Sequence, residues 1–402
     1  MYKLILVIVS SLIILLFADE LYAEGSIGTS GADFLELGVG SRPLAMGEAF
    51  TAEINDINSL YYNPAGLGSL RYPVFSIFHN ELILDSRFEN ISAAFPMYGG
   101  WLAISNSLFW VPAFDKINIY GDTVGKVKFY NGNFTTGYGY DFGEFYLGGS
   151  VKYIYQKMDT LFINSFALDI GVLRGMYLYS PYASPSKNFH IGLSILNVGT
   201  KAKEDPLPRM IRLGASYKPT KWVGVNVDMT ENFIRTSDFY DFLYLFEESF
   251  RVNVGVEFNY LELLYIRGGW RFNDAGTYSL GFGFNYAVLN TAFSIDTSFS
   301  DSGVFGPVYS LGITVKLIPK VVTVEDKMKA EVNYRRAIKY FIADDIDSAL
   351  ESFRIVRDYD PYFKNIDQKI KDLEEIKKLK AQNKELDAEL KKRIINDDES
   401  FY

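Results

Sequence analysis

Residues 251–260, RVNVGVEFNY, alternate apolar side chains with polar or small ones over their whole length. Successive side chains of a β-strand point to opposite faces, so one face of this segment is apolar and the other carries Arg251 and Glu257. The helical period does not produce such a pattern. An apolar face toward lipid and a polar face toward a wet lumen are typical of a transmembrane strand. The segment therefore predicts a membrane-spanning β-barrel.

The same alternation recurs at 278–286 and 309–317, and in shorter form at 211–217 and 223–229. Counted from about Pro73 to Ile318, the pattern gives about fourteen strands, and an even number returns both ends to the periplasmic side. The predicted fold class is an all-β transmembrane barrel of about 14 antiparallel strands with an N-terminal plug, followed by a small α-helical C-terminal domain.

The connections also favour a barrel over a soluble β-sandwich or propeller, because short and long ones alternate as periplasmic turns and outer loops do. Tight turns are expected at Pro219-Thr220, at Phe142-Gly143 and near Leu289-Asn290. Long loops are expected at 111–124, 200–208 and 231–248.

The amino terminus predicts export. Lys3 is followed by an apolar run from Leu4 to Phe17, which is short for a membrane span, and Ala23 stands at a plausible cleavage point. We therefore expect a signal peptide at 1–23, a plug at 24–72, a barrel at 73–320 and a periplasmic helical domain at 321–402. A retained N-terminal anchor is the alternative if Leu21-Tyr22-Ala23 is cleaved poorly.

Composition excludes several classes of protein. The chain has no cysteine, 29 Tyr and 32 Phe, which fits a barrel with aromatic residues at the membrane interfaces and excludes a disulfide scaffold. A net charge of -9 argues against nucleic acid as a partner. The only histidines are His79 and His190, and no metal-ligand spacing, phosphate loop or nucleophile elbow is present, so we expect no enzyme, no cofactor and no metal.

The predicted plug carries a recognisable sequence. RPLAMGEAF at 42–50 followed by NPAGL at 63–67 resembles the amino-terminal signature of the PorV/PorQ group of outer-membrane proteins, which is similar to the FadL-type fatty-acid transporters. The resemblance runs from about Ser26 to Ile318 and includes Pro206-Leu-Pro208 and RLGASY at 212–217. It implies a fourteen-stranded barrel with an amino-terminal plug inside.

Physical reading of the plug agrees with that resemblance. Small residues let a folded-back segment pass close to the wall, Pro64 fixes a turn, and Arg42 is expected to pair with a lumen carboxylate. The plug either only fills the barrel or moves to open a ligand path, and the candidate gating residues are Arg42, Pro43, Met46, Gly47, Asn63, Pro64 and Gly66.

Charged residues at lumen-facing positions either line a solute path or neutralise one another, and we favour neutralisation. They are Lys152, Arg212, Asp228, Arg251, Glu257 and Lys316. The loop at 231–248 offers outer contacts for a hydrophobic ligand or a protein, or simply belongs to the aromatic girdle. Its aromatic residues are Phe233, Phe239, Tyr240, Phe242, Tyr244 and Phe246.

The resemblance implies two functions of different classes. The FadL-like branch implies passage of hydrophobic small molecules, such as a fatty acid, across the outer membrane. The PorV branch implies a scaffold or shuttle in type IX-like protein secretion or surface attachment. We rank passage slightly above the scaffold and a purely structural envelope protein third, with outer-membrane lipid as the surrounding partner in each case. A gap in the wall would favour transport, and a sealed barrel with a rigid plug would favour the scaffold.

Glycine nearly vanishes after Lys320, and a helical domain is predicted there. Residues 326–360 resemble one tetratricopeptide-like hairpin, with Asp344-Asp345 in the turn and Asp347 as a cap of the second helix. One such repeat cannot bury its face alone, so we expect it to pack on the following helix, on the barrel rim or on a periplasmic protein.

Residues 366–394 form a candidate coiled-coil seam, because Ile370, Leu373, Ile376, Leu379, Leu386, Leu390 and Ile394 recur at three- and four-residue steps. Asn383 falls on the same seam and is expected to set its register. The seam predicts self-association or a periplasmic helical partner, and the alternative is a single solvated helix.

Overall fold

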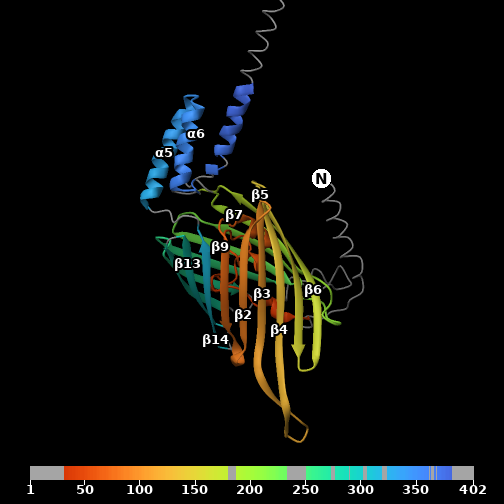
Figure 1. Ribbon diagram of the computed structural model, residues 1–402. Helices are drawn as coiled ribbons and strands as arrows, with labels where there is room; N and C mark the ends of the chain where they lie inside the picture. The colour runs from red at the N-terminus through yellow and green to blue at the C-terminus, as the bar shows by residue number, and fades with distance from the viewer. Residues whose placement is uncertain are drawn as a thin grey trace, which may run out of the picture. The chain divides into compact units, whose positions relative to one another are not determined.

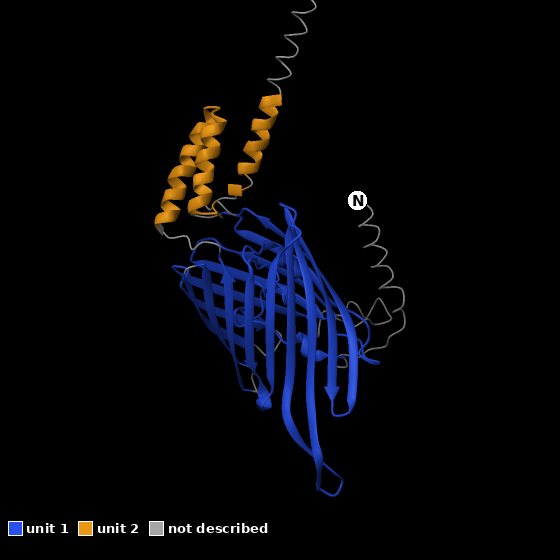
Figure 2. Ribbon diagram, in the orientation of Figure 1, with its two compact units in different colours: residues 1–318 blue, residues 319–402 orange. Residues whose placement is uncertain are grey.

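The computed structural model describes residues 31–179, 187–232, 250–272, 277–288, 290–301, 306–318, 324–361, 363, 366–367 and 369–382. The chain forms two compact units that divide after residue 318, a barrel unit and a helical unit (Figure 2). No helix among the described residues is long and apolar enough to cross a membrane.

The first unit is a closed barrel in which every strand pairs antiparallel with its neighbours in sequence, and β1 pairs with β14 from Val74↔Lys316 to Glu81↔Tyr309 (Figure 1). The predicted fold class is therefore confirmed. The strands are β1 Val74–Glu81, β2 Arg87–Met97, β3 Gly100–Ile117, β4 Thr123–Asp141, β5 Phe145–Met158, β6 Leu161–Met176, β7 Phe189–Gly199, β8 Met210–Tyr217, β9 Val223–Asn232, β10 Arg251–Tyr260, β11 Leu264–Phe272, β12 Thr277–Val288, β13 Thr291–Asp301 and β14 Pro307–Leu317.

Alternation in the sequence sets the two faces of the wall, as predicted. In β12, Leu280 and Phe282 are 53% and 65% exposed on the outer face, whereas Ser279 of the same strand is 2% exposed and faces inward. In β10, Asn253 and Glu257 face inward and are buried. The wall is thus apolar outside and polar inside, which is how a barrel meets lipid.

One expected loop is instead a hairpin. Strands β3 and β4 continue through 111–117 and 123–128 and meet in a turn in which the amide of Asn118 donates to the carbonyl of Asp122 at 3.0 Å. The prediction of a long loop at 111–124 was wrong because this ribbon extends past its neighbours (Figure 1), so both faces are solvated and the apolar alternation is lost. Residues 233–249 of the other aromatic loop lie outside the described residues.

The segment before β1 fills the barrel interior and is called the plug here. It contains short helices η1 Asp33–Glu36, α2 Ser41–Ala45, α3 Ser59–Tyr62 and η2 Pro64–Ser69. Asn63 caps η2, because its side-chain oxygen accepts from the amide of Ala65 and Pro64 occupies the first helical position. Phe50, Tyr62 and Leu67 are almost completely buried.

The helical unit contains α5 Val324–Ile342, α6 Ile346–Tyr359 and a further helical stretch at 366–382 with residue 368 undescribed. Asp345, not Asp347, caps α6, because its carboxylate accepts from the amide of Ser348. The predicted cap was two residues too late. Asp344 has a left-handed backbone with φ 63°, which ends α5 just before the cap.

The hairpin of α5 and α6 packs on the following helix, which is one of the three expected alternatives. Ile366, Ile370 and Leu373 are buried against Ala337 and Phe353. Ile370 and Leu373 therefore belong to the interior of this unit, and the prediction that they form an intermolecular seam was wrong. Leu379 is 54% exposed, and the remaining seam positions from Asn383 to Ile394 lie outside the described residues.

Candidate functional site: the plug and its cavities

Glycines on the inner face of the wall let the backbone of the plug lie directly against the strands. A Cβ built at Gly269 would overlap the backbone nitrogen of Gly47, and one built at Gly255 would lie 2.6 Å from the carbonyl oxygen of Met46. Similar close approaches run around the interior from β4 to β12. We call these positions the glycine belt: Gly137, Gly139, Gly148, Gly171, Gly192, Gly214, Gly255, Gly269 and Gly281.

Two of the candidate gating residues lie directly against this belt. Gly47 has φ 60°, and a Cβ there would lie 2.8 Å from the backbone nitrogen of Trp270, so both its conformation and its neighbour require glycine. Met46 is 1% exposed beside Gly255 and Gly269. The plug is therefore held in contact with the wall by shape as well as by polar groups.

Arg42 lies at the centre of an ion-pair cluster that joins plug to wall. Its guanidinium donates to both carboxylate oxygens of Glu257 on β10, at 2.9 and 3.1 Å. It also reaches Asp56 at 2.9 Å and Glu53 at 3.0 Å within the plug. Pro43 continues the same short helix, and the pairing of Arg42 with a lumen carboxylate is present as expected.

The cluster extends around the wall beyond Glu257. Arg267 on β11 contacts Glu257 at 2.7 Å and Asp296 on β13 at 2.6 Å. Burial opposes ionisation of Asp56, but Arg42 and Lys316 nearby hold its pKa below the usual value. Alternating charges of this kind neutralise one another, as we favoured for the lumen residues.

Asp228 and Arg212 form hydrogen bonds with the plug backbone between Glu48 and Thr51. The Asp228 carboxylate accepts from the backbone amides of Phe50 and Thr51 at 2.9 and 2.8 Å. Arg212 donates to the carbonyl of Glu48 at 2.7 Å and lies 3.4 Å from Asp228. These charges satisfy plug backbone groups that would otherwise be buried without partners.

The other lumen charges fall into the same pattern. Lys152 on β5 pairs with Asp169 at 3.0 Å, and both are nearly inaccessible. Arg251 lies 3.7 Å from Glu36 of the plug, and Lys316 donates to the carbonyl of Asn55 at 3.4 Å. The structure therefore brings all six predicted lumen residues to the interior, and their functional roles stay predictions.

The NPAGL segment also binds the wall. Asn63 donates to the carbonyls of Thr51 in the plug and Val172 on β6, at 2.9 and 3.2 Å. The carbonyl of Pro64 lies against Gly148, and Gly66 packs beside Ser59. Every polar link named here between plug and wall reaches a strand between β6 and β14.

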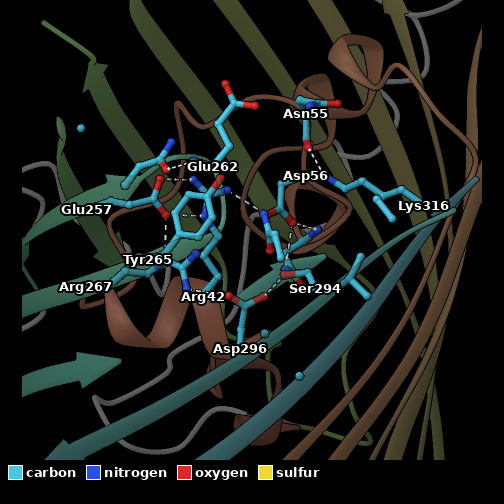
Figure 3. Close-up of a pocket in the computed structure, with 18 of the residues that line it drawn as sticks. Arg42, Asn55, Asp56, Glu257, Glu262, Tyr265, Arg267, Ser294, Asp296 and Lys316 are labelled. Carbon is cyan, nitrogen blue, oxygen red and sulfur yellow. Dashed lines mark hydrogen bonds and ion pairs between the residues drawn. The ribbon is translucent and has the colours of Figure 1, made fainter. Parts of the chain in front are cut away.

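A cavity of about 530 Å³ opens beside the Arg42 cluster, at the end of the barrel where β1 begins and β14 ends (Figure 3). Arg42, Glu257 and Arg267 converge on one side, Asp56 lies next to Arg42, and Lys316 lies on the other side near Asn55 (Figure 3). We call this space the charged cavity.

A second, narrow cavity of about 20 Å³ lies between the plug and strands β2 to β5. The plug contributes apolar side chains, including Leu35, Val39 and Tyr61, whereas the wall contributes mainly Ser, Asn and Thr. Ile57 and Asn58 line both this space and the charged cavity. We call the narrow space the seam, and its wall residues are Asn90, Ser92, Ser105, Ser107, Asn133, Thr135 and Lys152.

An apolar cluster adjoins the seam. Leu35 and Val39 of the plug pack in the same buried cluster as Phe78 on β1 and Phe88 on β2, whose rings meet edge to face at 6.3 Å. Tyr61 packs beside them, and its hydroxyl donates to the carbonyl of Leu35 at 2.5 Å. Apolar surface of this cluster therefore adjoins the seam, and Phe78 also lines the charged cavity.

Sequence reasoning missed several members of these sites. Arg267 and Asp296 were detectable in principle, because each is a charged residue that directly follows an outward-facing apolar residue of its strand, Ile266 and Ile295. Glu53, Asp56 and Tyr61 carried no comparable signal, because the plug has no regular period. His79 faces outward beside Glu89 at 2.8 Å and His190 faces inward, and no group of three or more His, Asp or Glu within the described residues is placed to hold a metal.

The fold and its interior define a class of protein, a plugged fourteen-stranded transmembrane barrel of the outer-membrane type. The model of the uncharacterised protein family UPF0164 matches residues 27–317, and the chain belongs to that family. A UPF0164 protein of Treponema pallidum (strain Nichols) is 27% identical over 225 residues, covering 49% of this chain and 53% of the relative. The chain thus spans about half the length of the curated relative it matches.

One solved structure shows the same fold at low sequence identity, and a second is similar over part of the chain. The toluene transporter TodX of Pseudomonas putida is 9% identical with a TM-score of 0.51, and the match covers 70% of this chain and 98% of TodX. A FadL homologue of Pseudomonas aeruginosa is 9% identical with a TM-score of 0.45 over 69% of this chain and 98% of its own.

Proposed function

We propose that this barrel lets small hydrophobic molecules cross the outer membrane, passing the plug along the seam between the plug and strands β2 to β5. The observation that carries the proposal is the position of Ile57 and Asn58, which line both the seam and the charged cavity. A molecule that widened the seam would therefore move from the apolar cluster into the charged cavity and out of the barrel.

The two sides of the plug differ in a way that favours this route. Hydrogen bonds and ion pairs attach it to strands β6 to β14, whereas across the seam its apolar residues face mainly uncharged polar side chains, with Lys152 as the one charged side chain among the described residues of the wall there. Separating an apolar surface from Ser and Asn side chains breaks fewer favourable contacts than separating Arg42 from Glu257. The seam is the side of the plug that opens at the lowest cost.

In this structure the seam is closed. A space of about 20 Å³ holds roughly one water molecule, so a hydrophobic solute needs local movement. The hydrogen bond from Tyr61 to Leu35 ties α3 to the segment before α2. We propose that this contact yields first, while Arg42, Pro43, Met46, Gly47, Asn63, Pro64 and Gly66 keep the rest of the plug in place.

The test uses substitutions that fill the seam from the wall. Ser105 faces the seam, and its neighbour Asn106 is exposed on the outer face of the same strand. Ser105→Trp and the control Asn106→Trp are compared for uptake of radiolabelled toluene and of a long-chain fatty acid by a bacterial host that lacks its own channels. We expect the unchanged protein and Asn106→Trp to take up more of the probes than the empty host does. In Ser105→Trp we expect the rate of uptake to fall at least tenfold, which corresponds to about 1.4 kcal/mol or more of added barrier.

Uptake equal to that of the empty host for both probes would refute passage. Equal uptake by the two Trp variants would refute the seam as the route. Folding of each variant is checked by the heat-dependent shift in gel mobility that closed barrels show.

A second function has its own support. The glycine belt and the Arg42 cluster hold a large part of the plug firmly, and the hairpin of β3 and β4 carries exposed apolar residues at its tip, with Ile119 91% and Tyr120 83% exposed. We infer as the alternative a PorV/PorQ-like scaffold for secreted proteins, with the tetratricopeptide-like helical unit in the periplasm. Loss of surface proteins from cells lacking the barrel, with hydrocarbon uptake unchanged, would favour it.

A further inference from the structure

The outward face of α5 combines apolar and basic side chains. Ala330 and Ala337 point into the core of the helical unit, so residues half a turn away face solvent. Met328, Val332 and Ile342 are 60%, 58% and 78% exposed there. Three apolar side chains exposed to solvent on one face of a helix form an apolar patch that suggests a binding surface.

Basic residues lie among these apolar ones. Arg335, Arg336 and Lys339 fall on the same face at three- and four-residue spacing and are exposed. Glu331 pairs with Arg335 at 2.9 Å, and Glu325 pairs with Lys329 at 2.6 Å. Arg336 and Lys339 give the face a positive balance over these two pairs. A helix with an apolar stripe edged by Lys and Arg is typical of attachment to an anionic membrane surface.

Chain length limits how far α5 is from the membrane. Strand β14 ends at Leu317, which is exposed on the lipid-facing side, and α5 begins at Val324. Seven residue steps span at most about 25 Å when fully extended. The chain therefore tethers the start of α5 within about 25 Å of Leu317, which leaves the leaflet at which β14 ends within reach of this helix.

We propose that the outward face of α5, formed by Met328, Val332, Arg335, Arg336, Lys339 and Ile342, docks on the anionic phospholipid headgroups of the leaflet at which β14 ends. The apolar side chains enter the boundary between headgroups and acyl chains, and the basic side chains bind the phosphates. This attachment is independent of whether the barrel transports a solute or holds a protein.

The test exploits the absence of cysteine from the chain. Val332→Cys in the full chain accepts one environment-sensitive fluorophore, and Glu351→Cys on the solvent face of α6 provides the control position. Each labelled protein is placed in nanodiscs of phosphatidylcholine, with or without phosphatidylglycerol, that contain a lipid-borne quencher. We expect quenching at residue 332 in the anionic nanodiscs to exceed that at residue 351 by at least about threefold.

Charge reversal separates binding to headgroups from simple proximity. Arg336→Glu with Lys339→Glu should abolish the excess quenching, whereas Lys371→Glu with Lys378→Glu, which changes net charge equally on another exposed surface, should leave it. Circular dichroism confirms that both variants keep their helices. Equal quenching at residues 332 and 351, no quenching in either lipid, or quenching that survives the reversal on α5 would each overturn the proposal.

Discussion

Arg42 and Glu257 stand 215 residues apart in sequence and are joined by two hydrogen bonds, from Nε to Oε2 at 2.9 Å and from Nη2 to Oε1 at 3.1 Å. Their side chains are 17% and 9% exposed, so the pair is largely shielded from water. A paired arrangement of this kind is strong because two N–H groups of the planar guanidinium each donate to a different oxygen of the carboxylate. The pair therefore fixes helix α2 of the plug to strand β10 of the wall.

Replacing Arg42 by glutamine should release this part of the plug. The change leaves Glu257, Glu53 and Asp56 short of a positive partner, at a cost of about 3–5 kcal/mol. Arg251→Gln is the control, because its nearest plug carboxylate is 3.7 Å away and both groups are more exposed, and it should cost about 1 kcal/mol or less. Proteolysis of the plug in detergent measures the difference. Similar cleavage of the two variants would contradict the role given to Arg42.

The glycine belt predicts a contrast between adjacent residues of β11. A Cβ at Gly269 meets backbone atoms of Met46 and Gly47, whereas one at Gly268 is 3.9 Å from the nearest atom, on Leu280. Gly269→Ala should therefore destabilise the barrel by about 1–3 kcal/mol through overpacking, and Gly268→Ala should be close to neutral. The temperature at which the folded band is lost on a gel gives the comparison, and equal temperatures would mean that the plug yields to the added methyl group.

Lowering the pH should destabilise the plug only below about pH 4, near the pKa of an unperturbed Asp. The pKa of Asp56 is lowered in the folded protein, because Arg42 and Lys316 outweigh the effect of burial. Its stabilising effect is therefore complete above about pH 4, near the pKa of an unperturbed Asp, and is lost as the pH falls through the lowered folded value. Protease sensitivity of the plug should stay constant from neutral pH to about pH 5 and rise below about pH 4. Asp56→Asn should reduce that rise, and an unchanged profile would exclude Asp56 as its source.

The corrected cap of α6 can be tested by three substitutions. Asp345→Ala removes the acceptor for the Ser348 amide and should lower the melting temperature of the helical unit, whereas Asp345→Asn keeps an acceptor and should largely preserve it. Asp347→Ala should have the smaller effect, because Asp347 lies within the first turn and its contact with Lys377 is exposed. Circular dichroism melts provide the ranking. A larger loss with Asp347→Ala than with Asp345→Ala would reverse the assignment.

Strands were predictable from sequence where lipid and lumen impose opposite chemistry on alternate residues. The segment 278–286 falls within β12 with Phe282 outside and Ser279 in the interior, as its pattern indicates. Residues 111–117 escaped recognition because water surrounds both faces of that ribbon, so neither face needs a particular residue type. The pattern thus reports the environment of a strand rather than its backbone conformation.

The interior was less predictable than the wall. Sequence indicated that Arg42 needs a carboxylate, but the choice of Glu257 depends on how a plug without periodicity folds inside the barrel. Asp228 was recognised as a lumen charge, yet its binding to the amides of Phe50 and Thr51 left no pattern in the sequence. The helical register likewise placed Ile370 on an apolar stripe and did not reveal that the stripe covers α5 and α6.

The glycine belt has a consequence for biogenesis. The wall meets the plug backbone from Gly139 on β4 to Gly269 on β11 with no clearance for a side chain, so we expect that the plug cannot be inserted into a finished cylinder. The plug precedes every strand in the chain, and the β1–β14 joint that closes the cylinder unites its first and last strands. We therefore expect the strands to assemble around the plug, with the pairing of β1 and β14 as the final step.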